Sequence, residues 1–176
     1  MRHKQYTAMG RELARRHVDI QHSPEKCRFL RILISSDPIQ KQLDLSEFNA
    51  SLRNRLDLSD GKAAMVLENY QADYSDNEGD FYAKYHHSAF LVLKLVGRDD
   101  YDGRDDVLDE CERIGEELMG AYIEQLTAAG LRITPDDVLQ EAIGPIGDGL
   151  VGCRFNYVFR SAATQALTYQ PSKFLD

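Results

Sequence analysis

The densest group of chemically useful side chains is the acidic stretch 97–117, GRDDYDGRDDVLDECERIGEE, in which ten of twenty-one residues are carboxylates. Carboxylates at this density can hold a divalent cation, and a cation so held can activate water for hydrolysis. The side chains that such a hydrolase would use are Asp99, Asp100 and Asp102, with His86 or His87. The hypothesis requires these side chains to converge in one cleft.

A calcium-binding loop is the most specific test of this stretch, because it places glycine sixth and a carboxylate first. With Gly103 sixth, Asp100 and Asp102 fall correctly at the third and fifth positions. Arg98 then falls first, and Asp109 stands where the bidentate glutamate is needed. Because the pattern fails at both ends, a calcium loop is not supported.

The beginning of a helix explains the same stretch better. Asp105 and Asp106 would lie in the first turn of a helix over 104–129, where each negative charge gains about 0.3–1 kcal/mol from the helix dipole. Farther along, the outer face of this helix carries solvent-exposed acids: Glu110, Glu117 and Glu124. We therefore expect a capped helix, with no catalytic, cofactor-binding or metal-binding residue in the chain.

The histidines give no stronger indication of a metal site. Neighbouring residues of a strand point to opposite faces, so His86 and His87 cannot bind one ion together. His17 lies at the edge of the apolar stripe of the first helix and has no second ligand at helical spacing. We interpret His17 as a packing residue.

The composition indicates one domain, 1–176, of a soluble protein: 43% of residues are hydrophobic and 28% are charged. A net charge of −8 argues against nucleic acid and anionic membranes as partners, and no apolar run is long enough to span a bilayer. The cysteines are widely spaced and lack a C-x-x-C pair, which favours free thiols in a reducing cytoplasm: Cys27, Cys111 and Cys153. The last two fall on expected core faces.

The periodicities predict an α+β fold, in which a mostly antiparallel sheet packs against a long amphipathic helix and an N-terminal helix. Helices are expected over 6–20, from a cap at Ser46 to the turn at 59–61, and over 104–129. Strands are expected over 63–74, 86–97, 138–144 and 151–160, with a hairpin turn at Asp148-Gly149. Residues 28–34 fit a strand better than a helix, 35–40 a loop, and 161–176 a polar, loosely held tail.

Three of these segments carry a resemblance to a known family: AAMVLENYQADY, AFLVLKLVGRDDYDGRDDVLDECERIGEEL and GPIGDGLVGCRFNYVF. In their order along the chain and in their residue patterns they resemble the small tail-completion and tail-terminator proteins of tailed bacteriophages and related mobile elements. The resemblance implies a non-enzymatic subunit without cofactor that forms a ring with copies of itself. It would join or cap a tail tube, in the host cytoplasm or in a virion.

The residues that could form contacts in such a ring lie on the polar face of the last strand and in an exposed loop: Arg154, Asn156, Arg160 and residues 75–80. Two other classes stay open. One is the carboxylate-metal hydrolase described above, and the other is a small interaction or regulatory protein that acts as a monomer or dimer. The size of the oligomer separates the ring subunit from the interaction protein.

Overall fold

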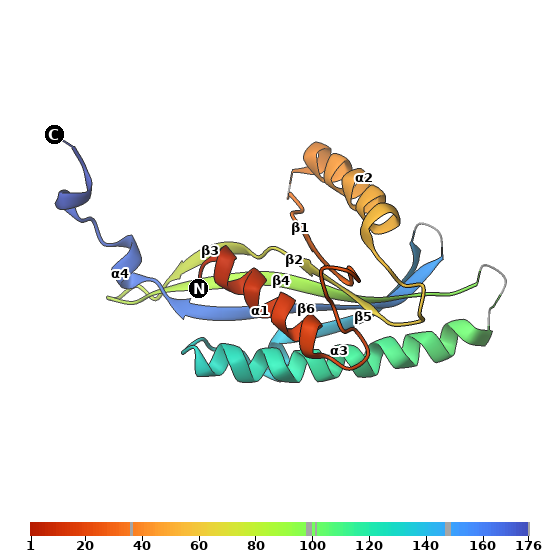
Figure 1. Ribbon diagram of the computed structural model, residues 1–176. Coiled ribbons are helices and arrows are strands. Elements are labelled where there is room, and N and C mark those ends of the chain that lie inside the picture. Colours follow the sequence, from red (N-terminus) through yellow and green to blue (C-terminus); the bar gives the residue numbers. More distant parts are fainter. Residues whose placement is uncertain (36, 98–99, 101, 147–148, 176) are drawn as a thin grey trace.

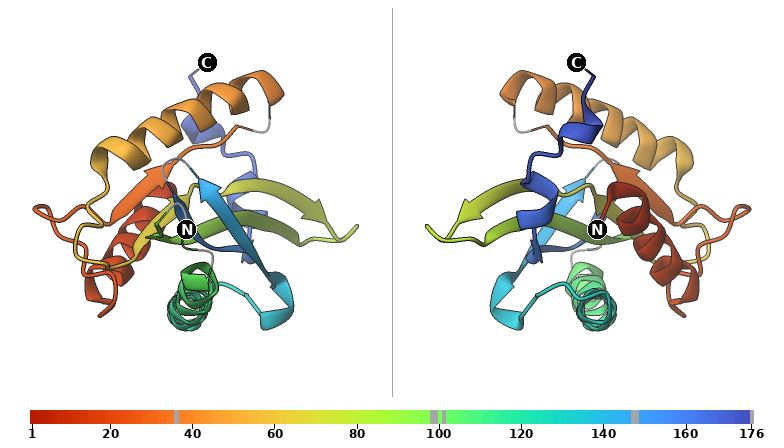
Figure 2. Two further views of the ribbon diagram at one scale, coloured as in Figure 1. Left: turned by 90° about the vertical axis from the view of Figure 1, so that its right-hand side faces the viewer. Right: turned by 90° about the vertical axis from the view of Figure 1, so that its left-hand side faces the viewer.

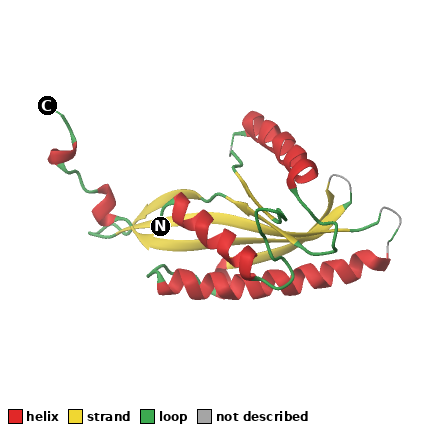
Figure 3. Ribbon diagram, viewed as in Figure 1, coloured by secondary structure: helices red, strands yellow, loops and turns green. Residues whose placement is uncertain are grey.

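The computed structural model describes residues 1–176 except 36, 98–99, 101, 147–148 and 176 (Figure 1). Helices and strands alternate irregularly along the chain, which confirms the predicted α+β class (Figure 3). The helices are α1 (His3–Arg16), α2 (Pro38–Arg55), α3 (Asp102–Ala128) and α4 (Thr164–Leu167), with 3-10 turns η1 (Pro135–Asp137) and η2 (Pro171–Lys173). The strands are β1 (Phe29–Ile32), β2 (Ala64–Glu68), β3 (Gln71–Asp76), β4 (Tyr82–Leu95), β5 (Val138–Ile146) and β6 (Leu150–Ala162).

The strands form one six-stranded sheet in the order β1-β2-β4-β6-β5, and β3 pairs with β4 beyond the end of β2. β1 runs parallel to β2, and every other pair is antiparallel, as expected. β4 is the central strand, because β2 and β3 share one of its edges and β6 follows the other along its length. The sheet is therefore built around a single strand of 14 residues.

One face of the sheet is buried under α1 and α3 (Figure 2). Apolar residues recur at three- and four-residue steps along α3, and this stripe meets the large aromatic side chains of β4 and β6. The fully or nearly fully buried members include Tyr6, Phe90, Ile114, Leu118, Tyr122, Phe155, Tyr157 and Phe159. At 1.5 Å per residue, the 27 residues of α3 extend over about 40 Å, enough to cross the whole sheet.

The opposite face is covered only in part. Phe48 and Leu52 of α2 pack on side chains from β1, β2 and β4, such as Ile32, Val66 and Leu93. Figure 2 shows α2 alone above this end of the sheet, with α1 and α3 on the other side. The rest of this face carries neither α1, α2 nor α3.

The second helix begins earlier than predicted, at Pro38 instead of Ser46, so the expected loop over 35–40 was wrong in its second half. Proline is well suited to the first helical turn, where its missing N–H has no intrahelical partner to lose. Just before it, the Asp37 carboxylate accepts a hydrogen bond from the backbone N–H of Gln40 at 2.9 Å. Ser46 is an exposed residue inside the helix.

The other predicted boundaries differ less from those in the structure. The first helix ends at Arg16, four residues before the predicted end. The segment over 63–74 is two strands, separated at Asn69 and Tyr70, and residues 29–32 are a strand, as preferred. Asp148 of the expected hairpin lies outside the described residues, and Gly149 has a left-handed φ of 104°.

Beyond β6 the chain leaves the body of the molecule. We call residues 163–175 the arm; it contains α4 and η2 and extends past the end of the sheet (Figure 1). The first two residues of the predicted tail belong to β6 instead. In both views of Figure 2 the arm rises on the same side of the sheet as α2.

Candidate functional site

The acidic stretch begins α3, as predicted. The Asp100 Oδ1 accepts a hydrogen bond from the backbone N–H of Gly103 at 2.8 Å, so this carboxylate caps the helix. Asp105 and Asp106 are exposed in the first turns. Asp99 lies outside the described residues, as does the side chain of Asp102, the first residue of α3.

The histidines of the hydrolase hypothesis point to opposite faces of β4, as expected. His86 is fully buried, stacked on Phe159 with ring centroids 4.4 Å apart, whereas His87 is exposed and its Nε2 lies 3.2 Å from Asp73 Oδ1. From His86 to Leu95, where β4 ends, the strand covers roughly 30 Å at 3.3 Å per residue. Since Asp100 follows that end, the structure does not bring Asp100 and the histidines together.

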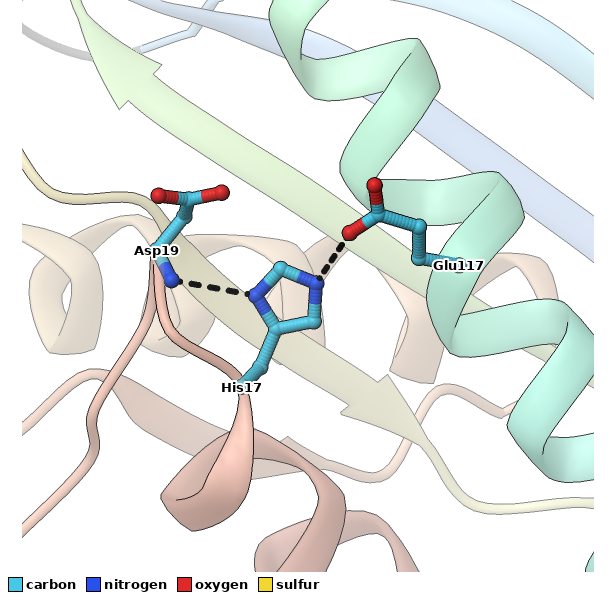
Figure 4. A group of neighbouring side chains, drawn as sticks. All are labelled: His17, Asp19 and Glu117. Atoms are coloured by element: carbon cyan, nitrogen blue, oxygen red, sulfur yellow. Dashed lines mark hydrogen bonds and ion pairs between the residues drawn. The ribbon is translucent and has the colours of Figure 1, made fainter.

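One group of His, Asp and Glu side chains does converge, and it contains the residue interpreted as a packing residue, His17 (Figure 4). One ligand atom each from His17, Asp19 and Glu117 lie within 4.8 Å of one another. His17 is the C-cap residue that follows α1, Asp19 lies in the turn after it, and Glu117 comes from α3. Glu117 is exposed, as predicted, and its carboxylate also lies 2.9 Å from the His17 Nε2, a contact that the helical spacing did not indicate.

The hydrogen bonds of this group favour an ion-pair clamp over a metal site. The backbone N–H of Asp19 donates to Nδ1 of His17 at 3.2 Å, so a neutral ring carries its proton on Nε2 and donates it to Glu117. A metal ion at Nε2 would need that nitrogen deprotonated. Arg113 supplies the positive charge, with contacts of 2.8 Å to both carboxylates.

The electrostatic effect of Arg113 is consistent with this interpretation. Its hydrogen bonds hold the pKa of Asp19 and that of Glu117 below their ordinary values, so both carboxylates are charged at neutral pH. The clamp thereby joins the turn after α1 to the middle of α3. Its chemistry is that of a structural contact between two elements.

The two buried thiols offer little reactivity. Cys111 and Cys153 are buried, as predicted, and burial raises the pKa of both, that of Cys111 to about 12. The thiolate is the reactive form of cysteine, and at neutral pH it is a negligible fraction of such a group. Both residues therefore act as small apolar side chains of the core.

The strongest candidate for a functional surface is the part of the sheet that α2 leaves uncovered, which we call the open face. Its residues stand side by side on neighbouring strands: Glu68, Gln71, Asp73, Tyr85, His87, Ala89, Asn156, Val158, Arg160, Leu139 and Glu141, with Arg154 beside Leu91. A hollow of about 610 Å³ lies on it, and three of its lining side chains are apolar: Ile34, Leu139 and Val158. Leu139 is 65% exposed.

The three residues that sequence patterns placed at an interface do lie on this face, but each is held within the chain. Arg154 forms a two-pronged ion pair with Glu68 across β4, and its Nε donates to Asn156 at 2.8 Å. Asn156 in turn donates to Glu141 at 3.2 Å. Arg160 pairs with Asp137 at 2.6 Å. These contacts fix the shape of the open face and balance its charges.

Comparisons of the chain with models of protein families, with curated proteins and with solved structures give no match. The resemblance to tail terminators therefore stays a prediction. Within the described part of the chain, each helix is too short or too polar to cross a membrane.

Proposed function

We propose that the chain is a structural subunit that associates with copies of itself and acts, like the tail terminators it resembles, by capping or joining a tube of other subunits. In this role its partners are its own copies and neighbouring assembly proteins. It would work in the host cytoplasm or as part of a virion.

The observation that carries this proposal is the arm. Its apolar side chains are exposed although they belong to large residue types: Leu167, Tyr169, Phe174 and Leu175. Exposed apolar groups close together mark protein–protein contact sites more often than single ones do. A segment that leaves the body with such side chains is typical of a subunit that packs against a neighbour.

A second feature points the same way. The β3–β4 hairpin projects from the sheet beside the base of the arm, with Tyr74 and Phe81 exposed along it (Figure 1). The hairpin includes the acidic loop 75–80, one of the expected contact segments. The arm and the hairpin thus place exposed aromatic side chains at one end of the molecule.

Native mass spectrometry of the concentrated protein tests the proposal. A closed ring predicts one dominant stoichiometry above the monomer, with little intermediate species, because closure satisfies every interface. Electron microscopy of the same sample should then show annular particles. A monomer or a simple dimer at high concentration would instead favour a small interaction protein.

A further inference from the structure

The outer side of α1 is a basic surface on an acidic protein. Four exposed cations of this helix stand against one carboxylate, that of Glu12, so its net charge is +3 in a chain of net charge −8: Lys4, Arg11, Arg15 and Arg16. Arg15 pairs with Glu12, and within the described part of the chain the other three cations form no ion pair. In Figure 2 α1 lies at the surface, with no other element over its outer side.

The neighbouring acids of the clamp do not cancel this charge. Asp19 and Glu117 are each paired with Arg113 at 2.8 Å. At the centre of the outer side stands Ala8, an exposed residue four positions from Lys4 and from Glu12. Residues four apart are neighbours on a helix, so this small residue leaves room for a partner's side chain beside the aliphatic stems of the cations.

The β3–β4 hairpin has the opposite charge at its tip. Residues 75–81 hold three carboxylates and no cation: Asp76, Glu78 and Asp80. All three are exposed, and none forms an ion pair with a described residue. Lys84, farther down the hairpin, lies over the rings of Tyr70 and Tyr74, and counting it still leaves a net charge of −2. Tyr74 and Phe81 add exposed rings beside these charges.

From this complementarity we infer that the hairpin tip of one subunit docks on the outer side of α1 of a second copy. The three carboxylates face the cations of α1, and the exposed rings pack on the stems of its arginines. This inference rests on the proposed function and names a contact that would build the assembly. Each copy carries one acidic and one basic surface, so the contact is head-to-tail. Interfaces of that kind generate rings when the rotation between subunits closes.

The arm belongs to the same end of the subunit as the hairpin tip. The backbone N–H of Ala163 donates to the Tyr82 carbonyl at 2.7 Å, and the N–H of Tyr82 donates to Thr164 Oγ1 at 2.8 Å. These bonds tie the base of the arm to the hairpin (Figure 1). A neighbour that receives the hairpin tip is therefore also within reach of the arm, and loss of either contact weakens the same interface.

Charge exchange tests the inference. The loop variant is Glu78→Lys/Asp80→Lys, which keeps Asp76 because its Oδ1 accepts the backbone N–H of residue 78 at 2.8 Å. The helix variant is Lys4→Glu/Arg15→Glu, at two exposed positions. Sedimentation velocity of the concentrated protein at low salt measures association. Each variant should associate at least about tenfold more weakly than the unmodified chain, because like charges then face each other at the contact.

The chain that carries all four substitutions has opposite charges at the contact again. It should associate about tenfold more tightly than either double variant, a recovery that damage to the fold cannot produce. The matched control adds Arg55→Glu/Arg132→Glu, two exposed cations outside α1, to the loop variant and should show no such recovery.

A chain with all four substitutions that associates no better than the double variants, or an equal recovery in the control, would overturn the inference. If the unmodified chain still forms oligomers, the proposed function survives that result. If the unmodified chain stays a monomer under the same conditions, both fail.

Discussion

The ring of Phe155 on β6 lies so close to the backbone of Gly115 on α3 that a Cβ on that glycine would come within 2.0 Å of the ring. The long helix can approach the sheet this closely only because residue 115 has no side chain. We expect Gly115→Ala to lower the free energy of unfolding by about 1–3 kcal/mol, the usual cost of overpacking a core. Urea denaturation measures this change.

The matched control lies five positions along the same helix. A Cβ on Gly120 would meet nothing within 4 Å apart from its chain neighbours and the nearby backbone of its own helix, and that glycine is exposed. Gly120→Ala should therefore raise the free energy of unfolding by about 0.5–1 kcal/mol, because alanine favours the helix over the unfolded chain. Equal effects of the two substitutions would contradict the close packing of α3 on Phe155.

The buried His86 should make stability depend on pH. Burial, together with the positive charges of Lys84 and the N-terminus, lowers the pKa of His86 from 6.5 to about 4. The unfolded chain then binds a proton at this histidine more tightly than the folded chain does. The free energy of unfolding therefore decreases as the pH falls from 6.5 toward 4, by about 3 kcal/mol at most. We expect the free energy of unfolding to decrease less in His86→Phe than in the unmodified protein when the pH is lowered from 7 to 5. Urea denaturation at each pH measures this difference.

Phenylalanine keeps the stacked ring on Phe159 and cannot titrate, so the comparison isolates one group. His3 and His22 also have lowered pKa values and contribute to the pH dependence of both proteins. An unchanged pH dependence in His86→Phe would show that His86 is not the cause.

The ion pair between Glu68 and Arg154 should couple two strands that do not touch. Both side chains are largely covered, and the pair crosses β4, the strand that lies between β2 and β6. A double-mutant cycle with Glu68→Gln and Arg154→Met should give a coupling of about 0.5–3 kcal/mol, typical of residues in one network. The exposed pair Glu12–Arg15 on α1 is the control and should show much weaker coupling. Equal coupling energies for the two pairs would show that the Glu68–Arg154 pair does not hold the open face in shape.

The clamp of His17, Asp19 and Glu117 should not depend on a metal ion. We expect the melting temperature to be the same in excess Zn²⁺ as in a chelator, because Arg113 already pairs with both carboxylates and the Nε2 of His17 is already hydrogen-bonded to Glu117. A saturable rise with Zn²⁺ that disappears in Glu117→Gln would show instead that the group binds metal. In that case the hydrolase hypothesis would return with a different set of ligands.

Local patterns predicted the elements better than the contacts between them. The apolar stripe of α3 and the alternation along β6 are properties of single segments, so their positions could be derived from spacing alone. The second helix was misplaced because Asp37 and Pro38 were interpreted as a loop, although both residue types also begin helices. Helix-start chemistry before an apolar stripe was the signal that could have located it.

The candidate site needed the folded chain. Glu117 meets His17 from 100 positions away, and Arg154 meets Glu68 from 86. No spacing rule reaches across such separations, since the sheet order decides which residues become neighbours. The alternation along β6 did place Arg154, Asn156 and Arg160 on one polar face, but it could not show that each has a partner within the chain.

The most direct test of self-association is the molar mass by light scattering after size exclusion, across a wide range of protein concentration. The unmodified chain is compared with an arm variant, Tyr169→Ser/Phe174→Ser/Leu175→Ser. As a control, Glu116→Ser/Glu124→Ser changes exposed positions on α3. The account predicts a mass that rises with concentration to a multiple of 20.0 kDa in the unmodified chain and the control, and a monomer in the arm variant. A constant monomer mass for all three proteins would contradict it.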